Sequence, residues 1–184
     1  MILAIDIGNT NTVIGCCKDN EILFVERLST DSSRTVLEYA ISIKNVLELY
    51  QIQPGALKGS IISSVVPPLT NLFRVAIRKI VGKEPMIVGP GVKTGLNILM
   101  DNPGQVGSDL IVNAVAALAE HPVPLIIIDL GTATTISVVD SKKNYIGGMI
   151  LPGIRVSLDS LVNRTSQLHR ISLEAPKRLI GKNT

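Results

Sequence analysis

The chain has 184 residues, a formal net charge of +3 and only 3% aromatic residues, with no tryptophan. Hydrophobic residues make up 46% of it, which suffices for an aliphatic core in one compact domain or two small ones. Scattered cations and few stacking aromatics argue against nucleic acid as a partner. We expect a cytoplasmic protein with no membrane partner, because the start lacks a basic leader and no apolar run approaches the roughly 20 residues that span a bilayer.

The first part of the chain predicts an antiparallel meander followed by alternating helices and strands. Apolar residues recur at spacings of three and four where we expect helices, and they form short β-branched runs where we expect strands. The expected elements are strands at 1–6, 12–17 and 22–28, a helix at 35–50, a strand at 59–66, a helix at 69–81, a strand at 86–88 and a helix at 107–119.

The second part repeats the opening meander. We expect strands at 125–129, 134–140 and 144–150 and a helix at 154–162. The opening strands of each half are joined by hairpins too short for crossovers, so the sheets must be mixed rather than all-parallel. The pattern predicts a duplicated α/β fold, with an N-terminal lobe at 1–121 and a C-terminal lobe at 122–184.

Two short stretches, 5–12 and 128–135, resemble each other and organise this plan. At one constant offset they share an aspartate, a glycine and a threonine: Asp6, Gly8 and Thr12 in the first, Asp129, Gly131 and Thr135 in the second. Glycine in a tight turn lets a phosphate approach the backbone N–H groups. A carboxylate beside phosphates needs a cation between them, and Mg²⁺ is usually held through water. We interpret the stretches as facing phosphate-binding loops; ordinary hairpins with acidic turns are the alternative.

Two further segments are candidates for chemistry. Gly107 and Ser108 lead into the helix expected at 107–119, and Asp109 lies in its first turn. Helix N-termini favour acidic residues and serine caps, so a purely structural role is open. A carboxylate here could also orient or deprotonate an acceptor hydroxyl in phosphoryl transfer. The glycine-rich segment 147–153 could be two turns, or a flat backbone surface for a base or sugar.

Together these segments resemble the type III pantothenate kinase family of the actin-like ATPase superfamily. The resemblance spans the chain and rests on Asp6-Ile7-Gly8-Asn9-Thr10, Ser64-Val65-Val66-Pro67, 104–109, 129–134, 147–153 and Gly181-Lys182-Asn183-Thr184. It implies duplicated actin-like, ribonuclease H-like lobes with mixed sheets. It also implies ATP-dependent phosphorylation of pantothenate to 4′-phosphopantothenate, the first step of coenzyme A biosynthesis, by a homodimer.

The resemblance further implies roles for individual residues. Asp109 would be the catalytic base, Asp129 would bind a monovalent cation, K⁺ or NH₄⁺, and Asp6 would bind Mg²⁺ through water. The residues implied at the ATP phosphates are Asp6, Ile7, Gly8, Asn9, Thr10, Asn11, Thr12, Val13 and Thr132. Those implied at pantothenate are Met100, Gly107, Ser108, Asp109, Leu110 and, across a dimer interface, Thr184. The segment 147–153 would face adenosine.

The chain departs from the family pattern at three places. Leu110 stands where the family has arginine and Met100 where it has tyrosine, both on the acceptor side, and neither can hydrogen-bond a carboxylate or amide. The chain also stops at Thr184, where family members continue, so we expect an incomplete second lobe with exposed apolar sheet. These departures leave two alternatives: a catalytically weak, nucleotide-binding regulatory protein of the same fold, or a kinase for another small hydroxyl-bearing acceptor.

Overall fold

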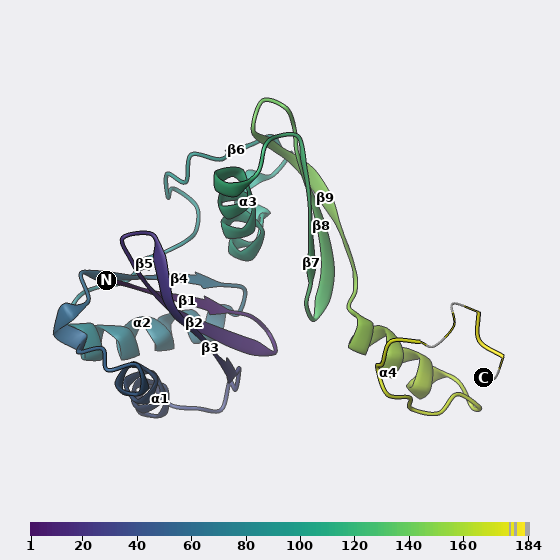
Figure 1. Cartoon of the computed structure of the whole chain (residues 1–184), viewed down its shortest axis with the longest axis horizontal. Coiled ribbons are helices and arrows are strands. Elements are labelled where there is room, and N and C mark those ends of the chain that lie inside the picture. The colour runs from purple at the N-terminus through teal and green to yellow at the C-terminus, as the bar shows by residue number, and fades with distance from the viewer. Residues whose placement is uncertain (177, 179, 183–184) are drawn as a thin grey trace.

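The structure is a computed structural model that describes residues 1–176, 178 and 180–182. The first of the two sheets in this part of the chain is mixed, with strand order β3-β2-β1-β4-β5. Its strands are β1 (Ile2–Ile7), β2 (Asn11–Lys18), β3 (Glu21–Ser29), β4 (Gly59–Ser64) and β5 (Met86–Ile87). The three opening strands are antiparallel, and β4 joins β1 in parallel after a helical crossover. Helices α1 (Val36–Leu49) and α2 (Pro67–Val81) cover one face of this sheet (Figure 1).

The alternation of β1 decides which of its side chains face the helices. Leu3, Ile5 and Ile7 are at most 2% exposed and belong to the core shared with α1 and α2. Because successive side chains of a strand point to opposite faces, Ala4 and Asp6 lie on the other face, away from these helices. The same alternation that builds the core therefore directs the Asp6 carboxylate toward the second half of the molecule.

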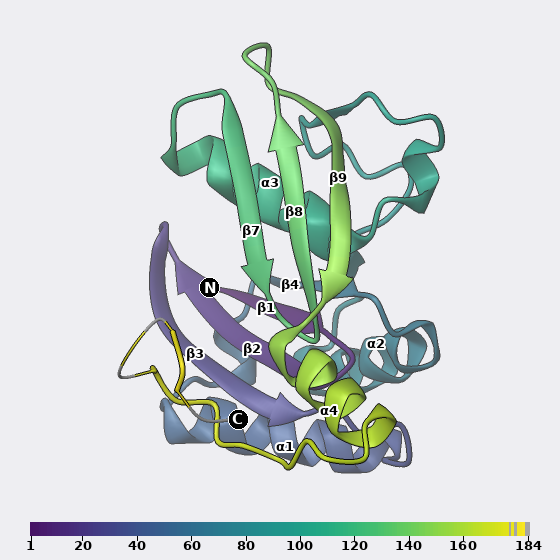
Figure 2. The same ribbon diagram turned by 90° about the vertical axis from the view of Figure 1, so that its right-hand side faces the viewer.

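The second sheet has the order β6-β9-β8-β7. Its strands are β6 (Asn97–Ile98), β7 (Leu125–Leu130), β8 (Ala133–Val139) and β9 (Asn144–Pro152). Helix α3 (Ser108–Glu120) packs on one face of this sheet and also contacts β4, so it connects the two sheets. Figure 2 shows α3 behind β7, β8 and β9, while α4 (Ile154–Arg164) lies below the end of β9.

The opposite face of the second sheet is open and apolar. Ile126, Ile128 and Leu130 alternate along β7 and are 59–70% exposed, and Met149 and Leu151 of β9 lie on the same face. The expected exposure of apolar sheet is thus confirmed. None of the helices in the described part of the chain is long and apolar enough to cross a membrane.

Most predicted elements are confirmed, although several begin or end one or two residues from the predicted positions. Helix α2 begins at Pro67 rather than at residue 69, because proline without its N–H is well suited to the first turn of a helix. The two-residue strand β6 was not predicted; it pairs in parallel with β9. Since β6 belongs to the second sheet but lies before residue 121, the division into lobes at 121 and 122 stays a prediction.

Candidate active site

Two hairpin loops from opposite sheets meet at their tips. One joins β1 to β2 and the other joins β7 to β8, and the hydroxyl oxygens of Thr10 and Thr132 are 2.6 Å apart. Each turn is closed by its glycine: Gly8 N–H donates to the Asn11 carbonyl and Gly131 N–H to the Ala133 carbonyl, both at 3.0 Å. The expectation that the two repeated stretches form tight turns facing one another is confirmed by this geometry.

The two hairpins are similar in sequence but differ in register. Ile7 pairs with Thr12 across the first turn, whereas Leu130 pairs with Thr134 across the second, so the second loop is one residue shorter. Thr12 and Thr135 are therefore not equivalent after the turn. Thr12 is fully buried, while Thr135 lines a pocket of the second lobe.

Thr30, which the sequence did not single out, supports the first loop from below. Its hydroxyl lies 2.9 Å from that of Thr12 and donates to the Gly8 carbonyl at 2.8 Å, and its backbone N–H donates to the Thr10 carbonyl at 3.0 Å. The Thr12 hydroxyl is thus engaged beneath the loop. The polar run after β3 was the only sequence signal for Thr30, and it is equally typical of a surface turn.

The predicted phosphate-binding residues occupy different positions around these loops. Asn9, Thr10 and Thr132 are exposed at the tips, and the Thr10 and Thr132 hydroxyls contact each other there. The Ile7 side chain is in the core, so only its backbone can contribute, and Val13 pairs with Asp6 on the face toward the second lobe. Asn11 is half-buried at the start of β2.

Three carboxylates lie near enough to one another beneath the loops for the charges of two to act on the third. Asp6 lies near the end of β1, Asp109 in the first turn of α3 and Asp129 near the end of β7. Burial is the main cause that raises the pKa of Asp6, the negative charges of Asp109 and Asp129 raise it further, and the neighbouring Ser63 hydroxyl opposes the rise. A site that holds a carboxylate against its own charge preference is well suited to a cation.

The donor set fits a cation that keeps most of its water. Among the residues that the structure describes, no three His, Cys, Asp or Glu side chains are grouped closely enough to hold a metal ion by themselves. Mg²⁺ at phosphates is commonly held by one or two carboxylates, water and the phosphates, which suits Asp6. Asp129 is exposed, and one of its oxygens accepts a hydrogen bond of 3.0 Å from Asn113 Nδ2.

Asn113 is a second residue that the sequence did not single out. It lies on α3 four residues after Asp109, and side chains at this spacing share a face of a helix. One helix face therefore carries the candidate base and the partner of Asp129. The sequence offered one signal for Asn113, its position four residues after Asp109 in a predicted helix. No local pattern indicated that residue 113 would contact residue 129.

The approach to Asp109 depends on its neighbours Gly107 and Ser108. Gly107 is the N-cap of α3, and a Cβ there would collide with Oδ1 of Asp109, so the carboxylate folds back over this glycine. Ser108 is buried: its hydroxyl donates to the Ser64 carbonyl and accepts from the Ser64 N–H, both at 2.9 Å. The Ser108 side chain thus anchors α3 to β4.

A pocket of about 360 Å³ lies beside the first turn of α3. It is formed by the segment 100–106, by Leu110 and by strands β8 and β9, and Met100 and Leu110 both line it. Met100 and Leu110, two of the predicted pantothenate-contacting residues, are therefore brought together, while Thr184 lies outside the described residues. Gly148 also lines the pocket, and a Cβ there would collide with the Ile136 carbonyl of β8.

The sheet order and the paired hairpin loops define an α/β protein with two mixed sheets, each carrying a hairpin loop that meets the other. A solved structure from Campylobacter jejuni, described as a candidate Baf family transcriptional activator, has a TM-score of 0.53 at 20% identity and covers 96% of this chain and 68% of that chain. A candidate 2-dehydro-3-deoxygalactonokinase from Sinorhizobium meliloti has a TM-score of 0.51 at 12% identity and covers 90% and 57%. These likenesses concern the fold alone, and the predicted fold class is confirmed.

Sequence comparison identifies the family. The model of the type III pantothenate kinase family matches residues 2–184. A type III pantothenate kinase of Halalkalibacterium halodurans is 46% identical over 184 residues, which are 100% of this chain and 72% of that relative. The chain belongs to the type III pantothenate kinase family, as its motifs suggested.

Proposed function

We infer that this protein is a pantothenate kinase, which transfers the γ-phosphoryl group of ATP to the primary hydroxyl of pantothenate in coenzyme A biosynthesis. Membership of the family over nearly the whole chain supports the activity. The structural observation that carries it is the meeting of Thr10 and Thr132 at 2.6 Å, on loops that follow the strands of Asp6 and Asp129. This arrangement offers hydroxyl and N–H donors to phosphates and carboxylates to a cation.

ATP would bind with its phosphates between the two loops. The hydroxyls of Thr10 and Thr132 and the backbone around Gly8 would donate to phosphate oxygens, which requires the two threonines to exchange their mutual contact for the ligand. Adenosine would lie against the segment 147–153. Gly153 N–H donates to the Thr132 carbonyl at 3.1 Å, so this segment already adjoins the second loop.

Asp109 would act on the acceptor hydroxyl. The hydroxyl oxygen attacks the γ-phosphorus, the bond from that phosphorus to the β,γ-bridging oxygen breaks, and the hydroxyl proton passes to the Asp109 carboxylate. The products are ADP and the phosphate ester. Mg²⁺ bound through water at Asp6 and a monovalent cation, K⁺ or NH₄⁺, at Asp129 would neutralise charge on the phosphates. Asp109 must be ionised for this step.

We also propose that the working form is a homodimer in which Thr184 of one copy reaches the pantothenate bound by the other. In that arrangement the pocket lined by Met100 and Leu110 would be completed by the second copy. Equilibrium sedimentation, with turnover measured over a range of protein concentrations, tests this proposal. A monomer with full specific activity would contradict it.

The deciding experiment is ADP release with and without pantothenate, in K⁺ and Mg²⁺, for the wild type and Asp109→Asn. Removing a general base lowers kcat by about 10²- to 10⁴-fold, and ATP affinity should be retained because the loops are unchanged. Unchanged turnover in Asp109→Asn would remove this residue from the mechanism. ATP binding without pantothenate-dependent turnover in the wild type would favour the regulatory alternative.

A further inference from the structure

Two serine hydroxyls join the Asp6 strand to the start of α3. Ser63 of β4 lies directly opposite Asp6 of β1 in the parallel register, and its hydroxyl donates to the Ser108 hydroxyl at 3.2 Å. Ser108 is the residue before the candidate base Asp109. Building on the kinase activity proposed above, we propose that Ser63 is a positioning residue for phosphoryl transfer: its hydroxyl supports the Asp6 carboxylate and fixes its place relative to Asp109.

The surroundings of Asp6 are apolar apart from Ser63. Both side chains line a recess of about 220 Å³ on the open face of the first sheet, whose other lining residues are aliphatic or glycine and include Val112 of α3. Ser63 itself is only 6% exposed. Water hydrates a carboxylate poorly in such a recess, so a hydrogen bond from a neighbouring hydroxyl contributes more there than at the surface.

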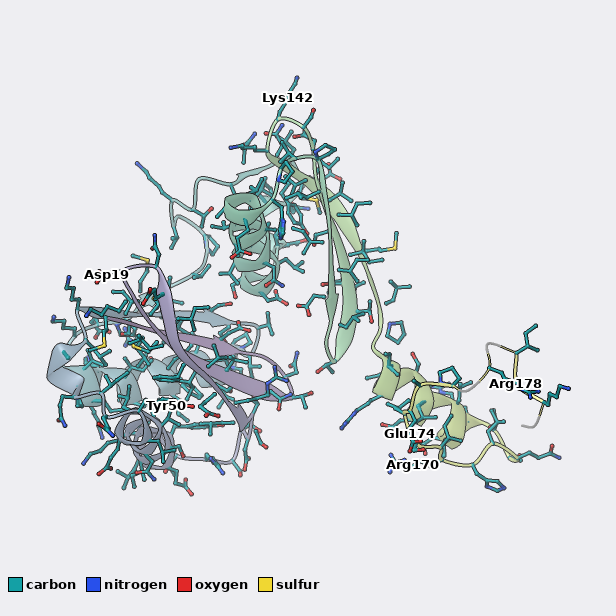
Figure 3. The ribbon with its side chains drawn as sticks, viewed as in Figure 1. Asp19, Tyr50, Lys142, Arg170, Glu174 and Arg178 are labelled. Carbon is teal, nitrogen blue, oxygen red and sulfur yellow. The ribbon has the colours of Figure 1, made fainter. Side chains whose placement is uncertain are left out.

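The charge of Asp6 has little other support from the protein. Asp6 forms no ion pair with any residue that the structure describes. Burial raises the pKa of Asp6, the Ser63 hydroxyl lowers it, and two neighbouring carboxylates raise it further. Lys142 at the tip of the β8–β9 hairpin and Arg170 beyond α4 both lie apart from the first sheet (Figure 3). The Ser63 hydroxyl is therefore the neighbour that favours the ionised carboxylate.

The Ser63 hydroxyl has one proton and two acceptors within reach. Ser108 does not depend on this proton, because its hydroxyl already donates to the Ser64 carbonyl and accepts from the Ser64 N–H, both at 2.9 Å. The Asp6 carboxylate is the stronger acceptor, since hydrogen bonds to charged groups are shorter and stronger than those between neutral groups. Ser63 thus contacts both Asp6 and the residue that begins α3, and it sets the separation between the cation-binding carboxylate and Asp109.

The kinetics of Ser63→Ala test this role, with Ser60→Ala as the matched control. Ser60 lies on the same strand and is also 6% exposed, but its hydroxyl has no hydrogen-bond partner among the described residues. Loss of a group that orients a metal ligand lowers activity by about tenfold or more, so we expect kcat to fall by about that factor in Ser63→Ala. KM for pantothenate should not change, because Ser63 does not line the pocket beside α3. A kcat equal to that of Ser60→Ala would overturn the inference.

Ser63→Thr separates the effect of the hydroxyl from that of packing. Threonine keeps the hydroxyl, its β-branched side chain suits a strand, and the recess has room for the added methyl group. We expect this variant to retain most of the wild-type kcat. A loss as large as that in Ser63→Ala would show that packing is decisive and would overturn the inference. If Ser63→Ala does not fold, Ser63→Cys replaces it, because a thiol is of similar size and a weak donor.

A double-mutant cycle on nucleotide binding needs no turnover and separates this inference from the proposed function. The probe is an ATP analogue with an imido group between the β- and γ-phosphorus, titrated by calorimetry in Mg²⁺. Ser63→Ala should raise its Kd about tenfold in the wild-type background and leave it unchanged in Asp6→Asn, because Ser63 acts through that carboxylate. Additive effects of the two substitutions would overturn the inference.

The two proposals fail in different ways. If the cycle is non-additive but the wild type releases no ADP in response to pantothenate, the proposed kinase activity is wrong and the role of Ser63 at Asp6 stands. If pantothenate is phosphorylated and Ser63→Ala matches Ser60→Ala in kcat and in nucleotide binding, the kinase activity stands and the role of Ser63 is wrong.

Discussion

Thr10 and Thr132 are separated by most of the chain, yet their hydroxyl oxygens lie 2.6 Å apart. The contact joins the loop of the first sheet to the loop of the second, so each lobe contributes one half of the candidate phosphate site. A hydroxyl can donate to a phosphate or to the other hydroxyl, and a bound polyphosphate would replace the direct contact by two contacts to one ligand.

Removing either hydroxyl should therefore weaken ATP binding. We expect Thr132→Val and Thr10→Val each to raise the Kd for ATP about tenfold or more, since a hydrogen bond to a charged group contributes about 1.5–3 kcal/mol. Isothermal titration calorimetry with Mg²⁺ measures this. Thr165→Val, which changes a threonine at the end of α4, is the control. Wild-type affinity in both loop variants would contradict the proposed phosphate site.

Gly107 has no side chain and so leaves room for the Asp109 carboxylate. Filling that space should lower turnover without changing ATP affinity. In Gly107→Ala the new methyl group would displace the Asp109 carboxylate, since Oδ1 occupies that space. Misplacing a reacting group by about 1 Å can cost on the order of 10²-fold in rate, and ATP affinity should stay unchanged. Gly104→Ala is the matched control, because nothing lies within 4 Å of a Cβ there. Equal turnover in the two variants would place Asp109 outside the reaction.

The Asp6 carboxylate should lower the stability of the folded protein although turnover requires it. Its pKa is raised in the folded protein by burial and by the charges of Asp109 and Asp129. The free energy of unfolding therefore falls as the pH rises from 3.8, the pKa of a free aspartate, through the higher pKa of the folded state. At neutral pH the whole of this destabilisation is present. Without Mg²⁺ at pH 7, we expect Asp6→Asn to melt about 2–4 °C above the wild type, a gain of about 1 kcal/mol. ATP turnover should be lost.

The pH dependence of this difference in Tm tests whether the Asp6 carboxylate is its cause. On acidification toward pH 4 the wild-type carboxyl takes up a proton and its cost disappears, so the difference in Tm between Asp6→Asn and the wild type should narrow. A constant difference, or a wild type that is the more stable at pH 7, would show that the carboxylate is not held against its charge preference. Thermal unfolding followed by circular dichroism supplies both measurements.

Asn113 should influence the monovalent cation through Asp129. Its Nδ2 donates to an Asp129 oxygen at 3.0 Å, and a lost hydrogen bond to a cation ligand typically weakens metal affinity about tenfold. We expect Asn113→Ala to raise the K⁺ concentration for half-maximal turnover by about that factor, with no change in Tm beyond about 2 °C. Ala116→Ser, on the exposed side of α3, is the control. An unchanged K⁺ dependence would remove Asn113 from the site.

The parts of the fold that depend on local pattern were predicted from the sequence. The strands of both meanders were predicted from short apolar runs, and helices α1 and α3 from apolar residues spaced three and four apart; both signals lie within the element itself. Strand β6 was missed because two residues carry no period, and its pairing with β9 comes from far along the chain. Thr30 and Asn113 were missed for the same reason, since their partners are remote in sequence.

By itself the sequence determined the two glycine turns, the acidic residue before each and the aspartate at the start of α3, because turn and helix-end chemistry is local. Only the tertiary structure decided that Thr10 meets Thr132, that the Ser108 hydroxyl faces β4, and that the pKa of Asp6 is raised. Distances between remote segments, burial and the Coulomb interaction of carboxylates exist only once the two sheets and α3 have packed together.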